Sequence, residues 1–530
     1  MALPNNTGIC GKCKADAPAR HTIRDGKVYL TKDCPTCGTT EALISSNAEV
    51  WQKKRQVWEY DPQKAGNCNL QCGSCNTDHN PAIVFVETTN RCNMQCPMCI
   101  ASVQIGTDYH PPLEYFDKLF KKLATFETKP FVELYGGEPT VRDDLLEIIK
   151  MARSYGLRPR VVTNGLKLAD EEYCRKLCET KSRFRFSFDG RNPEIYRKMR
   201  RSEGAYEKKL KALENIKKHN QYKHTILSCV GCGVNDDYVG DLIEVCHQYR
   251  DVFDELGIIP LKQDWEPGSG GTDAPTTIED IEAAVQRSVP DGQVEFISAG
   301  LVHYLTPARS FFTGNRQSDK FMFGGAHPNC ESATFLVSDG QKYRSINHYL
   351  KIPMSKLVEI VSKRTQKMNE RLLRYDREKF SDRWLARAII LKTLIPLIWI
   401  APDYNAIFKG RPIRGIILTL WGALKGERFE YALSRVSGLP RVLRVGVLPF
   451  EQYQAVESNR LANCKGAFVF EDTKTGQIKF VPTCTWFRFR QNVLQSITAK
   501  YGIASKTVGT QAKTSRDANS QSPAEGLIVK

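Results

Sequence analysis

The sequence from Ile83 to Cys99 reads IVFVETTNRCNMQCPMC, an apolar run followed by three closely spaced cysteines. A short apolar run that ends in polar residues is typical of a buried strand. Cys92, Cys96 and Cys99 have CxxxCxxC spacing, which lets three thiolates hold three irons of a cubane cluster and leaves the fourth iron open. This stretch therefore predicts a strand that leads directly into a metal-binding loop.

Strand and helix signals alternate from this stretch to about residue 292. Apolar runs predict six strands, at Ile83–Glu87, Phe131–Tyr135, Arg160–Thr163, Arg183–Phe188, Thr225–Val230 and Glu255–Pro260. Amphipathic patterns predict five helices between them, at Leu113–Glu127, Asp143–Tyr155, Asp170–Glu179, Ala205–His219 and Asp236–Tyr249. Repeated β–α units of this length form parallel sheets with crossover helices. Because polar motifs follow the strand ends, we expect an α/β fold built on a partial (β/α)6 barrel, with its site at that face.

A second motif, Gly136-Gly137-Glu138-Pro139, follows the second predicted strand. Glycine lets a backbone approach a ligand closely, and a carboxylate accepts hydrogen bonds from an ammonium group. Three cysteines alone would also fit a zinc knuckle that lacks one ligand. Two motifs at successive strand ends argue against that interpretation.

Polar residues also follow the third and fourth predicted strands. These residues are Thr163, Asn164, Ser187 and Asp189. Side chains at the carboxyl ends of barrel strands meet at one face, so the four are candidate ligand-binding residues. The competing interpretation is ordinary turn chemistry, because Asn-Gly and Asp-Gly are common turn dipeptides.

The cysteine motif, followed by GGEP about forty residues later, resembles the signature of the radical S-adenosylmethionine (SAM) superfamily. The resemblance implies a radical SAM barrel in which Cys92, Cys96 and Cys99 are the catalytic cysteines and hold a 4Fe–4S cluster whose open iron chelates SAM. It also implies reductive cleavage of SAM to a 5′-deoxyadenosyl radical, which abstracts hydrogen from an unactivated carbon. An electron donor such as ferredoxin or flavodoxin would be needed. The SAM-binding residues that it implies are Gly136, Gly137, Glu138, Pro139, Asn164, Ser187 and Asp189.

Two CxxC pairs lie near the N-terminus, Cys10 with Cys13 and Cys34 with Cys37. Together they supply four thiolates for a tetrahedral zinc or a single iron, between which the sequence does not decide. The second pair reads CPTCG and resembles a rubredoxin or zinc-ribbon knuckle. A zinc that only stabilises a small domain is the competing interpretation.

A further triad, Cys68, Cys72 and Cys75, repeats the CxxxCxxC spacing upstream of the first strand. Neither a strand before it nor a second GGEP after it is present, so we predict an auxiliary 4Fe–4S cluster rather than a second SAM site. His79 is a candidate fourth ligand.

Three late cysteines, Cys330, Cys464 and Cys484, are isolated in the sequence. A predicted hairpin of Ala467–Phe470 and Gln477–Phe480 would bring Cys464 and Cys484 together, as for another auxiliary cluster. The alternative for all three is ordinary buried cysteine. Helical spacing places Cys174 and Cys178 in the core, and the sequence assigns no role to Cys229 and Cys232.

Length and composition indicate a globular chain of several domains, since 530 residues exceed one ordinary core. No secretory signal opens the sequence and the clustered cysteines suit metal binding, so we expect a cytoplasmic protein. The domains that we predict are a knuckle domain at 1–60, an auxiliary-cluster segment at 61–80, the barrel at 81–292, a C-terminal α+β auxiliary-cluster and lipid-facing domain at 293–502, and a disordered tail at 503–530.

The formal charge of +17 requires an explanation. The sequence contains no recognisable nucleic-acid-binding motif, and residues 351–430 hold 17 Lys and Arg against 8 Asp and Glu. Apolar runs at Ala388–Ala401 and Gly415–Leu424 interrupt this basic region, and Arg441–Phe450 repeats the combination of basic and apolar residues beyond it. This pattern predicts peripheral contact with an anionic membrane surface. A solubilising basic face over buried core helices is the alternative.

The cysteine groups and GGEP, taken together over most of residues 10–490, resemble the archaeal tetraether lipid synthases (GDGT and macrocyclic archaeol synthases) and the bacterial membrane-spanning lipid synthases. This narrower resemblance implies a transferase of lipid biosynthesis that couples two lipid chain carbons, with an auxiliary cluster holding the first alkyl radical at sulfur. One alternative is a radical SAM methylase or modifier of a soluble cofactor such as a pterin. The other is a non-catalytic iron–sulfur electron carrier, against which GGEP argues.

Overall fold

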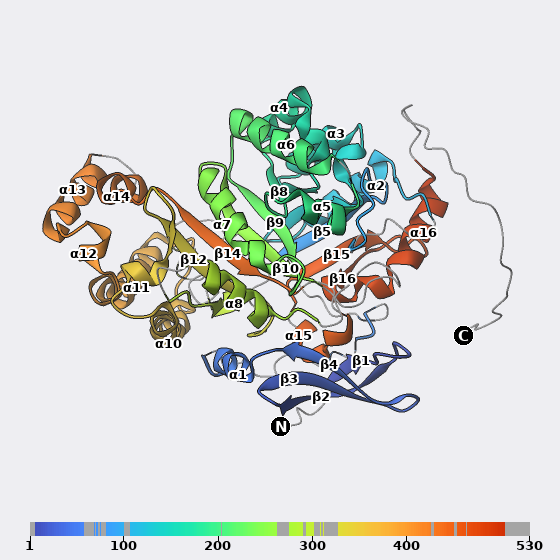
Figure 1. The fold of residues 1–530 in the computed structure, drawn as a ribbon, viewed down its shortest axis with the longest axis horizontal. Helices are drawn as coiled ribbons and strands as arrows, with labels where there is room; N and C mark the ends of the chain where they lie inside the picture. The colour runs from blue at the N-terminus through green and yellow to red at the C-terminus, as the bar shows by residue number, and fades with distance from the viewer. Residues whose placement is uncertain are drawn as a thin grey trace.

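A computed structural model shows a long central sheet with helices on its faces, a small N-terminal sheet beneath it and a helical group at one end (Figure 1). The structure describes residues 6–503 apart from 58–67, 69, 73–74, 76–80, 100–106, 203, 262–274, 290–292, 302–307, 309–310, 312–326, 426–428, 450–452 and 463. The predicted tail from residue 504 and His79 lie outside the described residues.

The N-terminal sheet has four antiparallel strands in sequence order: β1 (Thr7–Ile9), β2 (Asp16–Arg24), β3 (Lys27–Cys34) and β4 (Gly38–Ser45). Asp25 and Gly26 turn the chain between β2 and β3, both with positive φ. An Asp-Gly pair of this kind gives the tight turn that matches strand twist. Helix α1 (Ala48–Val57) follows the sheet.

The barrel strands are parallel neighbours in sequence order: β5 (Ile83–Thr89), β6 (Phe131–Gly136), β7 (Arg158–Thr163), β8 (Arg183–Ser187), β9 (His224–Val230) and β10 (Phe253–Pro260). Helices between them are α2 (Leu113–Ala124), α3 (Leu145–Ser154), α4 (Glu171–Glu179), α5 (Pro193–Arg200), α6 (Ala205–His219) and α7 (Val239–Gln248). All six predicted strands and all five predicted helices are confirmed, with ends shifted by a few residues. Helix α5 was not predicted.

The C-terminal strands extend the barrel sheet rather than forming a sheet of their own. Strand β14 (Val442–Val447) pairs with β10, and β15 (Gly466–Glu471) pairs with β5. The remaining strands are β11 (Ile297–Ser298), β12 (Ser332–Ser338), β13 (Tyr343–Ser345) and β16 (Ile478–Pro482). Both edges of the barrel sheet are therefore covered, which removes unpaired backbone groups from them.

This arrangement corrects one prediction and confirms another. Arg441–Phe450 is not an interfacial segment, because β14 lies inside the sheet with Leu443, Val445 and Val447 buried. The hairpin predicted between Cys464 and Cys484 is confirmed as β15 and β16, which pair antiparallel.

The helical group consists of α10 (Met354–Leu372), α11 (Phe380–Ile400), α12 (Tyr404–Ile407), α13 (Pro412–Leu424) and α14 (Phe429–Ser437), and it projects from the β12 end of the sheet (Figure 1). Ala386 and Ile390 of α11 pack against Met368 and Leu372 of α10. Within the described ranges, no helix combines the length and the apolarity that crossing a bilayer requires. Helices α8 (Ile278–Ser288), α15 (Ser458–Leu461) and α16 (Arg490–Tyr501) complete the described helices that concern the site.

Candidate functional site

The three catalytic cysteines predicted from the sequence lie in the loop that leaves β5, at the carboxyl end of the barrel strands. Cys92 and Cys96 are partly buried and Cys99 is exposed. Burial, with Glu138 nearby, raises the pKa of Cys92 to about 12. A thiol in this position ionises only when a cation compensates for its charge, which is the environment of a metal ligand.

The two glycines of GGEP serve the backbone packing of this loop. A Cβ on Gly136, whose φ is 137°, would lie 2.2 Å from the Thr89 carbonyl oxygen. A Cβ on Gly137 would lie 2.3 Å from the Arg91 carbonyl oxygen. Only glycine lets β6 end against the residues that precede Cys92.

Glu138 is almost fully buried, and its carboxylate holds the neighbouring turn together. Its Oε1 accepts hydrogen bonds from the Thr140 backbone N–H (3.0 Å), the Thr140 hydroxyl (2.6 Å) and the Thr163 hydroxyl (2.7 Å). Its Oε2 accepts one from the Asn164 backbone N–H at 2.6 Å. Pro139 begins the single 3-10 turn Pro139–Val141, which Glu138 caps. A carboxylate has about four acceptor positions, so Oε2 keeps one for a ligand.

Asn164 links the third barrel strand to the cysteine loop. Its side-chain N–H donates to the Asn93 side-chain oxygen at 2.7 Å and lies 3.9 Å from Cys92 Sγ. The Asn164 side-chain oxygen accepts from the Leu166 backbone N–H, as in an ordinary turn. The turn interpretation and the position beside the cluster loop therefore both hold for this residue.

Asp189 forms a buried ion pair that the sequence did not suggest. Its two oxygens each lie 2.7 Å from the Arg200 guanidinium. Burial opposes ionisation of Asp189, but the Arg200 charge outweighs it and lowers the pKa of that carboxyl. Arg200 also donates to the Ser187 hydroxyl at 3.2 Å and lies 3.9 Å from Cys96 Sγ. Ser187, Asp189 and Cys96 thus meet at one guanidinium.

Arg200 lies at the end of α5, the helix that was not predicted. Asn192 caps this helix by accepting from the Glu194 backbone N–H, and Pro193 is its first residue. Asn followed by Pro is a recognised start of a helix, so this signal was present in the sequence.

A second buried cation lies behind the pair. Lys209 is fully buried and donates to the Ser187 carbonyl oxygen. Burial and the nearby Arg200 charge lower the pKa of Lys209 to about 8. The face of the site beside Cys96 is therefore positively charged, as an anionic cluster or a carboxylate requires.

Cys229 and Cys232 lie near this face but apart from each other. Cys229 ends β9 and packs in an apolar cluster with Met98 and Met199, beside Cys96. Cys232 follows the strand and is partly buried. Cys174 and Cys178, by contrast, are buried in the barrel core as predicted.

The four N-terminal cysteines form a compact ligand set. The sulfur atoms of Cys10, Cys13, Cys34 and Cys37 all lie within 4.8 Å of one another. Backbone N–H groups of Cys13 and Lys12 lower the pKa of Cys10 to about 6, which favours the thiolate. This arrangement suits one tetrahedral metal ion.

The N-terminal sheet packs on the segment around α15 through a buried acid. Glu457 lies 2.9 Å from the His21 ring nitrogen Nε2 and accepts from the Asn6 side chain at 2.7 Å. Burial opposes ionisation of Glu457, but His21 outweighs it and lowers the pKa of that carboxyl well below its ordinary range. Because the pKa of Glu457 is lowered in the folded protein, its carboxylate stabilises the fold at pH values above the ordinary Glu pKa. This stability is lost as the pH falls from the ordinary pKa toward the lowered one.

Replacing Glu457 with glutamine is expected to lower the free energy of unfolding by about 3 kcal/mol, because one partner of a buried pair is removed. Urea unfolding at neutral pH measures the loss, which should shrink as the pH is lowered. Glu41→Gln is the matched control, since its pair with Arg24 is exposed and should change stability by less than about 1 kcal/mol. Equal effects of the two substitutions would contradict the assignment.

Cys68, Cys72 and Cys75 are brought close to the late cysteines. Cys68 packs in the apolar cluster that contains Leu461, Cys464 and Cys484. Cys72 lies 3.5 Å from the Thr485 hydroxyl, and burial raises its pKa to about 11. Cys75 is exposed.

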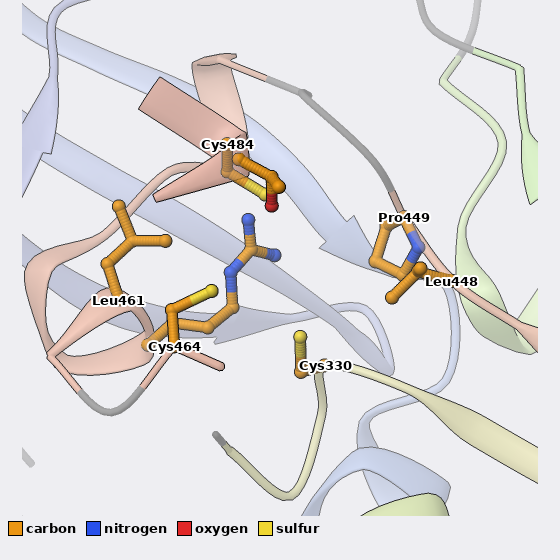
Figure 2. Close-up of a pocket in the computed structure, with 8 residues that line it drawn as sticks. Cys330, Leu448, Pro449, Leu461, Cys464 and Cys484 are labelled. Atoms are coloured by element: carbon orange, nitrogen blue, oxygen red, sulfur yellow. The ribbon is translucent and has the colours of Figure 1, made fainter. Parts of the chain in front are cut away.

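The late cysteines line one small pocket (Figure 2). Figure 2 shows the sulfur atoms of Cys330, Cys464 and Cys484 pointing into it from three segments of the chain. Cys330 precedes β12, Cys464 precedes β15 and Cys484 follows β16. The fold therefore gathers the three cysteines that the sequence leaves isolated.

Comparison with known protein families supports this site. The model described as the radical SAM superfamily matches residues 86–246, which include the cysteine loop and GGEP. The model described as the HMPTM N-terminal zinc ribbon domain matches residues 3–46, which include the four N-terminal cysteines.

Three relatives are similar over different shares of the chain. A 7,8-dihydro-6-hydroxymethylpterin dimethyltransferase of Methanocaldococcus jannaschii is 28% identical over 377 residues, 66% of this chain and 73% of that protein. A probable GTP 3′,8-cyclase of Methanothermobacter marburgensis is 28% identical over 42% of this chain and 74% of that protein. An Fe-coproporphyrin III synthase of Methanosarcina barkeri is 36% identical over 26% of this chain and 34% of that protein. Residues 86–246 are therefore similar to radical SAM proteins, and residues 3–46 are similar to a zinc-ribbon domain.

Proposed function

We propose that this radical SAM enzyme acts on lipid alkyl chains and joins two chain termini by a carbon–carbon bond. The observation that carries the proposal is the exposed apolar surface that α11 and α13 each present. Thirteen large hydrophobic side chains are exposed on these two helices: Phe380, Trp384, Leu385, Leu391, Ile395, Ile398, Trp399, Ile400, Ile413, Ile417, Leu418, Leu420 and Trp421. Trp399 is 63% exposed and Ile413 is 75% exposed.

Such a surface needs an apolar partner. Large contiguous apolar patches are rare on proteins that stay in water, and they mark sites of contact with lipid or protein. Exposure on this scale argues against the alternative of two buried core helices. Aromatic side chains such as Trp384, Trp399 and Trp421 suit the boundary between headgroups and acyl chains.

Basic residues border this surface, and their charge selects the partner. Lys392, Lys409, Arg411, Arg414 and Lys425 are exposed on or between the same helices. Helices with tryptophans, leucines and isoleucines beside lysine and arginine are typical of the interface of a bilayer. Anionic headgroups would pair with the basic residues, so we place the protein peripherally on an anionic membrane surface.

The chain's residues would hold the cofactors as follows. Cys92, Cys96 and Cys99 would bind the 4Fe–4S cluster, with the Arg200 guanidinium 3.9 Å from Cys96 Sγ. Glu138 and Asn164 lie where the amino-acid end of SAM would meet the open iron. When bound, the cluster supplies the electron that splits SAM into methionine and the 5′-deoxyadenosyl radical.

The proposed coupling has a fixed balance of atoms and electrons. Each 5′-deoxyadenosyl radical takes one hydrogen atom from one terminal methyl group and leaves as 5′-deoxyadenosine. Joining two termini therefore consumes two SAM molecules and two electrons from an external donor such as ferredoxin or flavodoxin.

Auxiliary clusters at Cys68, Cys72 and Cys75 and at Cys330, Cys464 and Cys484 are part of the proposal. Thiolates of one cubane bind different irons, so they lie further apart than those around a single ion. The pocket lined by Cys330, Cys464 and Cys484 brings these three thiols together with an arginine, which fits an anionic group. In the N-terminal site, a single zinc or iron fits the compact set of four sulfurs.

Methylation of a pterin is the second candidate. The similarity to a pterin dimethyltransferase over 66% of this chain favours it, as does the match to the zinc ribbon of that group. A soluble pterin gives no reason for the exposed surface on α11 and α13, so we place this function second.

One experiment compares the two candidates directly. Reconstituted enzyme, SAM and a reductant are incubated with phosphatidylglycerol vesicles whose acyl chains end in CD₃, or with 7,8-dihydro-6-hydroxymethylpterin. We expect deuterium in 5′-deoxyadenosine and a coupled lipid product only with the vesicles. Replacing Trp399 and Trp421 together with serine should reduce vesicle binding about tenfold or more, since each buried tryptophan contributes on the order of 1.5–3 kcal/mol.

The matched control replaces two exposed apolar residues elsewhere, Ile23 and Tyr222. These substitutions should leave vesicle binding unchanged. Two results together would contradict the lipid proposal and support the second candidate: a methylated product in the incubation with the pterin, and 5′-deoxyadenosine without deuterium in the incubation with the vesicles.

A further inference from the structure

The pocket in Figure 2 contains a buried arginine with unused hydrogen-bond donors. Arg460 lines the pocket beside Cys330, Cys464 and Cys484 and is 7% exposed. Its Nε and Nη2 atoms have no hydrogen-bond partner among the residues that the structure describes. The other lining residues are Leu448, Pro449, Leu461 and Thr483, none of which carries a negative charge.

Two other arginines in the described part of the chain are well paired. Arg142, which is buried, binds the Thr88 carbonyl oxygen and the Asp144 carboxylate, and Arg444, which is partly buried, binds Glu255 and Glu331. A buried charge without a partner costs several kcal/mol, so proteins keep one only where something compensates for it. The contrast indicates that Arg460 has a partner outside the polypeptide.

The fold fixes Arg460 in this position. It belongs to α15, a single turn that starts just after Glu457. Glu457 is held by His21 and Asn6 of the N-terminal sheet, and the Ser458 hydroxyl accepts from the Thr7 backbone N–H at 3.0 Å. The zinc-ribbon domain thus secures the turn that carries the guanidinium.

The pocket also defines the chemistry of the missing partner. Three thiols and one guanidinium face it, and the Leu448, Pro449 and Leu461 side chains restrict water. Thiolates bind soft metal centres, and a guanidinium binds anions. A 4Fe–4S cluster with three thiolates is an anion at either oxidation level, so it satisfies both requirements.

We propose that Arg460 is the counter-ion and hydrogen-bond donor of an auxiliary cluster held by Cys330, Cys464 and Cys484, and that it raises the reduction potential of this cluster. The inference rests on the proposed assignment of this pocket to a cluster. Reduction adds one negative charge, and a fixed positive charge in a poorly hydrated pocket stabilises the reduced form more than the oxidised form.

The test follows the electron paramagnetic resonance signal that disappears in Cys330→Ser, which should also lose about four irons per chain. In Arg460→Met, the midpoint potential of this signal should fall. At the wild-type midpoint, the ratio of reduced to oxidised cluster should fall about tenfold or more. Arg460→Lys keeps the positive charge, so its midpoint potential should lie between those of the wild-type protein and Arg460→Met. Lys474→Met removes an exposed charge from the β15–β16 turn and should leave the potential unchanged.

A second measurement uses the wild-type protein, in case Arg460→Met does not retain its cluster. With ¹⁵N-labelled arginine, the reduced cluster should show a weak ¹⁵N coupling that is absent in Arg460→Lys. If the cluster is present but the potential is unchanged in Arg460→Met and the coupling is unchanged in Arg460→Lys, the role of Arg460 is overturned while the cluster assignment stands. Unchanged iron in Cys330→Ser would overturn the cluster assignment, and the inference with it.

Discussion

Replacing Cys96 with alanine will abolish release of 5′-deoxyadenosine from SAM and remove about four irons per chain. Cys92, Cys96 and Cys99 would each hold one iron in the proposed cluster, so the variant would keep only two of the three cysteine ligands. Product release under reducing anaerobic conditions and iron content are the two measurements. The expected loss of activity is complete, down to the rate without enzyme.

Cys246→Ala is the matched control for this experiment. Cys246 is a fully buried thiol on α7 in the barrel core. Its replacement should cost stability but leave iron content and SAM cleavage in place. A Cys96→Ala enzyme that still releases 5′-deoxyadenosine would exclude the assigned cluster position.

Replacing Arg200 with methionine is expected to destabilise the protein by about 3–5 kcal/mol and to abolish SAM cleavage. The destabilisation follows because Asp189, whose side chain is fully buried, loses its partner. The loss of cleavage follows because the guanidinium lies 3.9 Å from Cys96 Sγ, where it would stabilise the negative charge of the cluster. Chemical unfolding and product release measure the two effects separately.

The double variant Asp189→Leu with Arg200→Met separates structure from function. Removing both charges should restore most of the lost stability, since a buried pair is often replaceable by apolar residues. SAM cleavage should stay absent. Restored cleavage in the double variant would show that Arg200 serves only to neutralise Asp189.

The barrel was predictable because its sequence signals are local. Ile83–Val86 is an uninterrupted apolar run, and β5 is buried at every position. The next three strands each end at a turn dipeptide, Gly136-Gly137, Asn164-Gly165 or Asp189-Gly190, so their ends could be predicted to within a few residues. The Asn192-Pro193 start of α5 is equally local, but this helix has only eight residues.

The extension of the sheet could not be predicted in the same way. Val442–Val447 contains one basic residue, Arg444, among apolar residues, a pattern that fits a strand and an interfacial segment equally well. Its pairing with β10 joins residues almost two hundred positions apart, and pairing over such distances leaves no local sequence signal. The interfacial prediction for this segment was wrong for that reason.

The candidate site shows the same division. Cysteine spacing and GGEP predicted the cluster loop, and the radical SAM superfamily model matches the residues that contain both motifs. Spacing gave no indication of Arg200 or Arg460, because Arg200 lies more than a hundred residues from Cys96 and Cys330 and Cys484 reach Arg460 from other segments of the chain. The gathering of Cys330, Cys464 and Cys484 is likewise a product of the folded sheet.

Binding of SAM before and after loading of the cluster tests the central claim most directly. Equilibrium dialysis with labelled SAM, performed anaerobically on apoprotein and on reconstituted protein, gives the two affinities. We predict that SAM binds measurably only to the reconstituted protein and that Cys92→Ala removes this gain, because the open iron is the main ligand of the SAM amino-acid end. Equal SAM affinity with and without the cluster would contradict the account.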